Sequence, residues 1–379
     1  MAGLVVQKYG GTSVADLQRI AVVADHIAAT VASGQKVVVT VSAMGKQTDE
    51  LMAMALQLHD CPPQREVDML LTTGERVSMA LLSIALSKRG LPSQSLTGSQ
   101  SGILTDEVHG NARVKKVLGD RIREGLSHDR VVIVAGFQGV SPITKEITTL
   151  GRGGTDLSAV ALAIALQANH CELYKDVTGF FTADPRLVPQ ARKLDEICYA
   201  DASSLCWHGA KIIHSRAIHL AAKFQLPLQI RSSFDLEESG THIVRKTAME
   251  SPFVTAITHC DDVKLVTLKG NSSQLAQLLG TLWQKGHAPL LCYAETNQMR
   301  LVLPQKAQVE NATQVQSDIG AITIVGSGFR QSPEIIDQTL QCLGKQPQYM
   351  DIQDNRLTII LPQENLHGSL GALHQTLFQ

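Results

Sequence analysis

The sequence has 379 residues, which is too long for one compact core and predicts two or three domains. Its 34 basic and 35 acidic residues leave a formal charge of -1 with no block of either sign, so neither nucleic acid nor a membrane surface is an expected partner. Seven cysteines without a C-x-x-C pair argue against a metal cluster, and in a chain without a secretory leader they predict reduced thiols in the cytoplasm. The longest apolar helical pattern, residues 157–168, is too short to span a bilayer.

In chain order, the first 245 residues alternate short apolar runs with helical periodicity. This alternation predicts an α/β domain with a mainly parallel sheet sandwiched by helices. The expected strands are residues 4–7, 36–41, 92–96, 130–135, 172–175 and 228–231. The expected helices are residues 14–31, 50–58, 66–89, 111–126 and 156–168, with a further helix beginning at residue 209.

A glycine loop with Lys8, Gly10 and Gly11 follows the first strand, at the end where such sheets usually bind ligands. Its spacing fits neither a Walker A loop nor a dinucleotide-binding fingerprint. A lysine before paired glycines suggests a point charge on a phosphate whose oxygens are held by loop N–H groups. An ordinary turn with a surface lysine explains the same residues.

A second glycine loop, residues 148–158, joins a buried strand to a helix. Three glycines in four residues allow close approach of a ligand, and the helix behind them directs free N–H groups and a positive dipole end at it, which favours an anion. Arg152 adds a forked donor for a carboxylate or phosphate, whereas Asp156 would orient a nearby cation. A solvated arginine in a simple turn is the alternative.

Four further residues are candidates for binding a small polar ligand. Gly74 interrupts a helical pattern, which indicates close approach of another backbone or a ligand, and Glu75 beside it would meet an ammonium group. A solvated glutamate on an exposed face is equally compatible with this pattern. Ser42 and Thr48 follow the second strand and offer hydroxyl groups.

Two candidates for nucleotide contacts lie later in this part of the chain. Phe180 and Phe181 form an aromatic pair suited to covering a base. Lys211, in the first turns of the helix expected from residue 209, is a second candidate phosphate lysine, although a lysine in a helix is usually solvated.

After Pro252 the pattern changes to strand-helix-strand-strand-helix, and this order occurs twice. The repeat predicts two ferredoxin-like α+β units, residues 253–320 and 321–379. The expected strands are residues 254–259, 264–268, 288–293, 299–303, 321–325, 348–352 and 357–361, and the expected helices are residues 273–285, 307–318, 333–343 and 364–377. Because the repeats carry no catalytic-looking residues, they suggest assembly or small-ligand sensing.

Taken in order, the loops of the first domain resemble the motif set of the aspartate kinases, within the amino-acid kinase superfamily. The motifs are residues 8–13, 39–49, 73–78, 136–139, 148–159, 176–189 and 209–214. The resemblance implies a catalytic domain at residues 1–246 with the amino-acid kinase fold. The tandem repeat after it resembles the paired ACT domains of such kinases.

The resemblance implies a phosphotransferase that uses ATP to phosphorylate the β-carboxylate of L-aspartate, the first step towards lysine, threonine and methionine. It also implies Mg²⁺ held mainly by the nucleotide phosphates rather than by protein ligands, and a cytoplasmic homodimer or higher homo-oligomer assembled through the ACT region. The implied catalytic residues are Lys8, Asp156 and Lys211. The implied substrate contacts are Ser42, Thr48, Glu75, Arg152, Gly153 and Thr155. The implied nucleotide contacts are Lys8, Gly10, Gly11, Lys175, Asp176, Phe181, Asp184, Arg186 and Lys211.

Some residues depart from the family pattern. Lys175 stands where many relatives have Thr and Phe181 where many have Tyr, which leaves the adenine and ribose contacts open. The acidic-Pro-Gly turn of the effector loop is absent from both repeats, which predicts a mainly dimer-forming role and weak or absent end-product inhibition. Two other functions stay open: a kinase for another small acid of the N-acetylglutamate or carbamate type, and a non-catalytic regulatory protein that binds amino acids.

Overall fold

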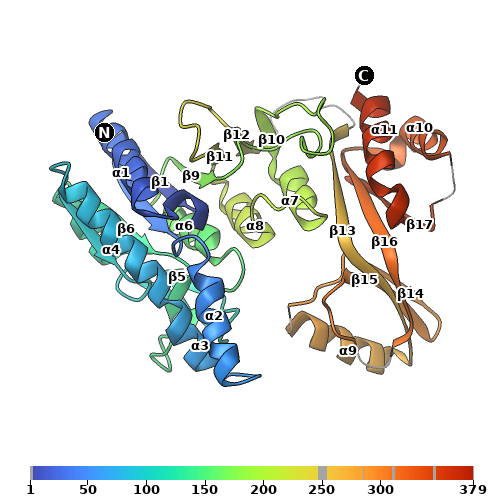
Figure 1. The fold of residues 1–379 in the computed structure, drawn as a ribbon, viewed down its shortest axis with the longest axis horizontal. Helices are drawn as coiled ribbons and strands as arrows, with labels where there is room; N and C mark the ends of the chain where they lie inside the picture. The colour runs from blue at the N-terminus through green and yellow to red at the C-terminus, as the bar shows by residue number, and fades with distance from the viewer. Residues whose placement is uncertain (1–2, 246–253, 285, 310–311, 345–346, 379) are drawn as a thin grey trace. The chain divides into compact units, whose positions relative to one another are not determined.

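The computed structural model describes residues 3–245, 254–284, 286–309, 312–344 and 347–378 (Figure 1). These residues form two compact units. The first contains residues 3–180, 193–199 and 212–245, and the second contains residues 181–192, 200–211 and the described residues from 254 onwards. The domain bounds 1–246, 253–320 and 321–379 stay a prediction.

The first unit is built on an eight-stranded sheet in the order β10-β12-β11-β9-β1-β2-β6-β3. Among the described residues, the β11–β12 pair is antiparallel and the other pairs of this sheet are parallel. The strands are β1 (Leu4–Tyr9), β2 (Lys36–Val41), β3 (Ser93–Leu96), β6 (Val131–Ala135), β9 (His170–Lys175), β10 (Glu196–Cys198), β11 (Leu228–Ser232) and β12 (Thr241–Val244). A mainly parallel sheet was predicted, and the fold confirms it.

Helices cover both faces of this sheet, and the alternation of side chains along β1 decides which residue faces which layer. Val5 and Tyr9 lie in the core with α1 (Leu17–Ala32) and α4 (Thr73–Ser87). Lys8, one position before Tyr9, points to the opposite face of the sheet and bonds to Asp156 on α6 (Gly154–Ala165). The remaining helices of this unit are α2 (Gln47–Leu58), α3 (Gln64–Leu71), α5 (Asp120–Ser127) and α8 (Ser215–Phe224).

A smaller sheet in the order β5-β4-β7-β8 completes the first unit. Its strands are β4 (Ile103–Thr105), β5 (Val114–Val117), β7 (Gln138–Val140) and β8 (Ile147–Thr149). The helix predicted at residues 111–126 is therefore wrong in its first half, where Val114 and Val117 favour a strand. Lys211 does not lie in a helix either, because α8 begins only at Ser215.

One stretch of the described residues, Gln64–Ser87, has the length and apolar composition needed to cross a membrane. It consists of α3 and α4, which meet at Thr72. Asp68 and Glu75, one on each helix, are buried carboxyl groups.

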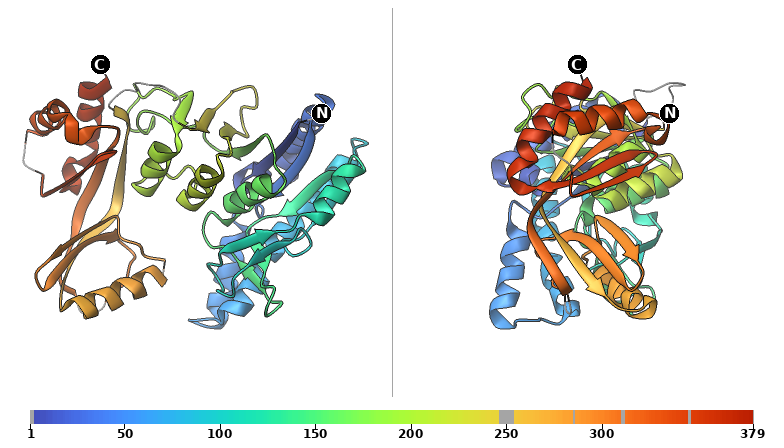
Figure 2. Two further views of the ribbon diagram at one scale, coloured as in Figure 1. Left: turned by 180° about the vertical axis from the view of Figure 1, so that it is seen from behind. Right: turned by 90° about the vertical axis from the view of Figure 1, so that its right-hand side faces the viewer.

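The second unit is built on one antiparallel sheet in the order β14-β15-β13-β16-β18-β17. Its strands are β13 (Val254–Lys269), β14 (Leu291–Glu295), β15 (Gln298–Pro304), β16 (Ala312–Gly326), β17 (Tyr349–Gln353) and β18 (Arg356–Pro362). Its helices are α9 (Ser272–Gln284), α10 (Pro333–Leu343) and α11 (Leu366–Phe378), with most of α7 (Tyr199–Trp207). The two predicted ferredoxin-like repeats are joined through β13 and β16, which run side by side along the middle of the sheet (Figures 1 and 2).

Two predictions for this unit are wrong in detail. Residues 254–259 and 264–268 belong to one strand, because a bulge between Cys260 and Val263 accommodates the polar residues between them. The helix predicted at residues 307–318 is instead the first half of β16 from residue 312 onwards, where pairing with β13 overrides the local polar pattern.

The segment 181–192 packs into the hydrophobic core of the second unit. Ala183 and Val188 are buried there against residues of β13, β16 and α11. The Ile257 amide donates a hydrogen bond of 2.7 Å to the Thr182 carbonyl, and the Thr182 hydroxyl lies 2.9 Å from Nε2 of the buried His374. The C-terminal unit therefore fixes the backbone of this segment.

Candidate active site

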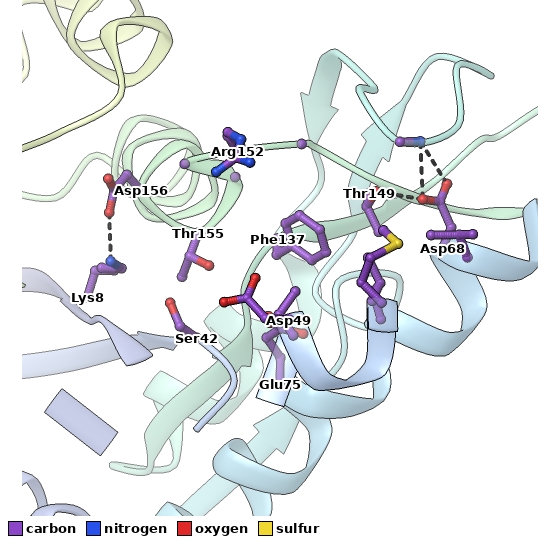
Figure 3. A pocket seen from close by; sticks show the side chains of 18 of the residues that line it. Lys8, Ser42, Asp49, Asp68, Glu75, Phe137, Thr149, Arg152, Thr155 and Asp156 are labelled. Carbon is purple, nitrogen blue, oxygen red and sulfur yellow. Dashed lines mark hydrogen bonds and ion pairs between the residues drawn. The ribbon is translucent and has the colours of Figure 1, made fainter. Parts of the chain in front are cut away.

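A pocket of about 530 Å³ opens in the first unit beside Lys8 and the start of α6 (Figure 3). It is lined by residues Lys8, Ser42, Thr48, Asp49, Met52, Gln64, Val67, Asp68, Leu71, Glu75, Gly110, Phe137, Thr149, Gly151, Arg152, Gly153, Gly154, Thr155, Asp156 and Lys175. Most of the polar lining comes from segments that follow parallel strands or begin helices, so the pocket lies where sheets of this type usually bind ligands.

A buried ion triad forms one wall of the pocket. The Asp156 carboxylate lies 2.8 Å from Nζ of Lys8 and 2.7 Å from Nζ of Lys175. All three side chains are largely buried: the exposed fraction is 4% for Asp156, 6% for Lys8 and 15% for Lys175. Because one carboxylate faces two ammonium groups, the triad keeps a net positive charge at the pocket wall.

Burial has opposite consequences for the two kinds of group in this triad. It lowers the pKa of Lys8 to about 8, and the attraction of Asp156 only partly offsets this. Burial also opposes ionisation of Asp156, but the ammonium groups of Lys175 and Lys8 outweigh it and hold the pKa of Asp156 well below its usual range. At neutral pH Asp156 is therefore ionised.

Glycines bring the loop after β2 close to the loop after β1 and to α4. A Cβ at Gly11 would lie 3.0 Å from the Gly45 carbonyl oxygen, and the Gly45 amide donates to the Gly11 carbonyl at 3.1 Å. A Cβ at Gly74 would lie 2.7 Å from the Cβ of Ala43. The close backbone approach predicted at Gly74 is thus confirmed.

Glu75 is a buried carboxyl group in the pocket with one oxygen unpaired. Its Oε1 accepts a 3.3 Å hydrogen bond from the Ala43 amide, whereas Oε2 has no partner within the described part of the chain. The residue is only 3% exposed, and burial raises the pKa of Glu75 to about 7. A buried, unpaired acceptor of this kind is suited to a cationic donor supplied by a ligand.

Arg152 supplies the opposite charge. It is exposed at the start of α6 and, among the described residues, forms no hydrogen bond or ion pair. Gly151 (φ +75°) and Gly153 (φ +66°) flank it in the left-handed region, which explains the predicted need for glycine in this loop. Figure 3 shows Arg152 and Glu75 extending from different elements around the same pocket.

We expect Gly153→Ala to destabilise the protein and to displace Arg152. A Cβ at Gly153 would overlap the side chain of His214 in addition to the strain of φ +66°. Gly34→Ala is a matched control because Gly34 has φ +89° and no neighbouring atom within 4 Å of the added Cβ. Chemical denaturation should show a loss of unfolding free energy clearly larger than that of the control. For Gly34→Ala we expect a loss of about 1 kcal/mol. Equal losses would show that the overlap is relieved without cost.

Asp68 is a pocket residue that the sequence analysis missed. It is fully buried on α3, and its carboxylate accepts hydrogen bonds from the Thr149 hydroxyl at 2.6 Å and from the Gly110 amide at 3.1 Å. Nδ1 of His109 lies 2.7 Å from its other oxygen. Asp68 therefore joins α3 to the end of β8 and to the loop at His109 and Gly110. Its sequence signal was an aspartate between the apolar positions Val67 and Leu71.

Phe137 was also missed as a pocket residue. It adopts φ +67°, which is strained for a bulky side chain. Its amide donates to the Ser158 hydroxyl at 3.1 Å, and its carbonyl accepts from the Leu150 amide at 2.8 Å. These bonds hold the backbone in place and direct the ring into the pocket wall (Figure 3).

The structure brings together nine of the residues selected from the sequence. Those lining the pocket are Lys8, Ser42, Thr48, Glu75, Arg152, Gly153, Thr155, Asp156 and Lys175. Gly10, Gly11 and Asp176 belong to the same unit but not to the lining. Phe181, Asp184, Arg186 and Lys211 belong to the second unit, where Arg186 forms a two-pronged ion pair with Asp184 at 2.6 and 3.0 Å.

Residues 3–232 match the sequence model of the amino acid kinase family. The chain belongs to this family. It is 40% identical to the aspartokinase of Geobacillus stearothermophilus, with 98% of this chain and 97% of that protein covered. It is 37% identical to the aspartokinase of Corynebacterium glutamicum, with coverages of 98% and 95%. Within the amino acid kinases, the chain is therefore a member of the aspartokinases.

Solved structures agree at the level of the fold. Escherichia coli aspartokinase III in complex with aspartate and ADP superposes with a TM-score of 0.86 at 22% identity, over 99% of this chain and 100% of that chain. The aspartate kinase from Synechocystis is 33% identical, with a TM-score of 0.59, over 99% of this chain and 69% of that chain.

Proposed function

We propose that this chain transfers the γ-phosphoryl group of ATP to the β-carboxylate of L-aspartate and forms 4-phospho-L-aspartate. This reaction is the first step towards lysine, threonine and methionine. Two groups of opposite charge in one pocket carry the proposal: a carboxylate oxygen of Glu75 and the guanidinium of Arg152, neither of which has a partner among the described residues. The relatives' shared activity and the aspartate and ADP bound to Escherichia coli aspartokinase III support the choice of ligands.

The chemistry asks little of the protein beyond position and charge. A substrate carboxylate has a reference pKa near 4, so it is already ionised and nucleophilic at neutral pH and needs no general base. The protein must align the two reactants and neutralise the charge that the transferring phosphoryl group carries. The net positive triad at the pocket wall fits the second task.

The pocket residues that were selected from the sequence have the following roles in this reaction. Lys8 lies over the transferring phosphoryl group, and Asp156 orients it. Arg152 binds a substrate carboxylate and Glu75 the free ammonium group. The hydroxyl groups of Ser42, Thr48 and Thr155 and the backbone of Gly153 bind the remaining polar edges of the substrate.

The nucleotide contacts are those that the resemblance to the aspartate kinases implies. The glycine backbone at Gly10 and Gly11 binds phosphate oxygens beside Lys8, and Lys175 adds charge through Asp156. Residues Asp176, Phe181, Asp184, Arg186 and Lys211 complete the set. Mg²⁺ would enter with the nucleotide phosphates, which would hold most of its coordination sphere.

Hydroxylamine trapping tests the function directly. We expect acyl hydroxamate to form only when aspartate, ATP and Mg²⁺ are all present. Glutamate and N-acetylglutamate are the informative competitors, because an N-acetyl group has no positive charge to pair with Glu75. Equal turnover of either compound would reject aspartate as the substrate, and no turnover of any acid would favour a regulatory protein.

Glu75→Gln should weaken aspartate binding by about 1.5–3 kcal/mol, the range for a lost hydrogen bond to a charged group. Because burial holds the pKa of Glu75 at about 7, binding of an ammonium group should also release about half a proton at pH 7. Calorimetric titration of aspartate in two buffers of different ionisation enthalpy measures both quantities. The control is Glu66→Gln, an exposed glutamate on α3. If Glu75→Gln bound aspartate with unchanged affinity and unchanged proton release, another residue would have to bind the ammonium group of aspartate.

The remaining proposals concern assembly and regulation. The paired repeats would form ACT domains that hold a cytoplasmic homodimer or higher homo-oligomer, and inhibition by lysine, threonine or methionine would be weak or absent because both effector turns are altered. Sedimentation and titration of these amino acids at sub-saturating aspartate address the two points. Inhibition at low micromolar effector would place a working effector site in the altered turns.

A further inference from the structure

In the part of the chain that the structure describes, one group of three side chains has the composition and spacing of a metal site. It consists of His259, Asp261 and His367, whose ligand atoms all lie within 4.8 Å of one another. The group lies entirely within the second unit and outside the pocket described above. We propose that it binds a divalent transition-metal ion of the Zn²⁺ class.

The ligands come from two regular elements that pack together. His259 and Asp261 are two positions apart on β13, where the bulge between Cys260 and Val263 begins, and their ligand atoms lie within 4.8 Å of each other. His367 is in the first turn of α11, which packs beside β13 (Figure 1). Buried Leu366 anchors that turn in the core. The backbone at Gly209 packs closely on β13 at the same point, because a Cβ at Gly209 would overlap the His259 carbonyl. Sites on rigid elements hold their ligands more reproducibly than sites on loops.

The donor set also selects the kind of ion. Two imidazole nitrogens and one carboxylate oxygen suit Zn²⁺ and its neighbours in the first transition row, whereas Mg²⁺ and Ca²⁺ prefer oxygen ligands alone. Ligand atoms around tetrahedral Zn²⁺ lie about 3.3 Å apart, given bonds of about 2.0 Å. The ligand atoms of the group lie within 4.8 Å of one another, and because Asp261 and His367 are exposed, rotation of their side chains can bring the atoms to the shorter tetrahedral spacing.

The charges around the group are mixed. The imidazole rings of His259 and His367 meet edge to face with centroids 5.7 Å apart. Burial, with the positive charges of His367 and Arg186, lowers the pKa of His259, while Asp261 and Asp184 oppose this effect. An ion at this place would join β13 to α11 and would add positive charge near Asp184.

Zinc titration of the metal-free full chain tests the site without using activity. Isothermal titration calorimetry with ZnCl₂, in the absence of nucleotide, should show one saturable site, and Co²⁺ should give the intense visible absorption of a tetrahedral complex. His367→Ala and His259→Ala should weaken Zn²⁺ binding by roughly tenfold or more, since even residues that only support a metal ligand commonly cost that much. Asp262→Asn is the matched control, an exposed aspartate next to Asp261 that is not part of the group.

Thermal unfolding gives a second readout that detects misfolded variants. Zn²⁺ should raise Tm in the unmodified chain and in Asp262→Asn but not in His367→Ala, whose metal-free Tm should match that of the unmodified chain because the side chain is exposed. Undiminished Zn²⁺ affinity in both histidine variants would overturn the proposal. Binding that disappears in Cys260→Ser but persists in the histidine variants would overturn it as well.

Discussion

Replacing Lys8 with alanine should lower kcat by roughly 10²–10³-fold, the usual effect of removing one donor that stabilises charge in a transition state. Lys8 is bonded to Asp156 at the pocket wall and is assigned to the phosphoryl group, so the KM for aspartate should change little. The hydroxamate assay at varied aspartate separates the two constants. Lys116→Ala, an exposed lysine on β5, is the control. A large rise in KM at unchanged kcat would move Lys8 to the substrate carboxylate.

The pH profile adds an independent signature for Lys8. Burial lowers the pKa of Lys8 to about 8, so its ammonium group is lost above that pH in the free enzyme. The kcat/KM for ATP should therefore decline as pH rises through about 8, since this constant reports groups of the free enzyme. Stability should move in the other direction. The folded-state pKa of Lys8 lies below the ordinary lysine value of 10.5, so the unfolded chain binds more protons between these two values and the folded state gains stability as pH rises.

Asp156→Asn should cost about 3–5 kcal/mol of stability, the range for removing one partner from a buried ion pair. The substitution leaves the buried ammonium groups of Lys8 and Lys175 facing each other without a counter-ion. Asp129→Asn is the matched control, because Asp129 is 90% exposed and lies 3.6 Å from Lys36. Such a surface pair contributes only about 0–1 kcal/mol.

Urea denaturation at pH 7 and at lower pH checks this prediction. The pKa of Asp156 is held far below its usual range, so its contribution is complete above its unfolded-state value and is lost as pH falls below it. The difference between the unmodified chain and Asp156→Asn should therefore shrink on acidification. Equal stability of Asp156→Asn and Asp129→Asn at pH 7 would show that the triad is not a buried, charged cluster.

Much of the pocket could be predicted from the sequence because many of its residues lie at the ends of strands or in the first turns of helices. Lys8, Glu75 and Asp156 were placed by glycines and strand ends, and the structure gathers them around one pocket. Lys175 was selected for the nucleotide, yet the structure bonds it to Asp156 as well. This contact depends on how β9 pairs beside β1 and on how α6 packs against both strands, and these are properties of the folded sheet.

The residues that the sequence did not reveal depend on contacts between distant segments. Asp68 occurs in an ordinary amphipathic helix, and its role in the pocket wall depends on hydrogen bonds from Thr149 and Gly110, some 40 to 80 positions away. Phe137 carries a positive φ that its sequence neighbours do not require. The misassigned helix at 307–318 has the same cause, because pairing of β16 with β13 outweighs local preference there.

The position of Ala183 and Val188 in the core of the second unit limits how this protein can have been assembled from parts. A chain that ended at residue 245 would keep Lys8, Asp156 and Glu75, yet it would expose that apolar surface to water and deprive Thr182 of its partners on β13 and α11. Gene fusion or domain exchange at the junction near residue 250 would therefore break a folded structure. Segment 181–192 and the C-terminal sheet should therefore be kept together when the chain is truncated or engineered.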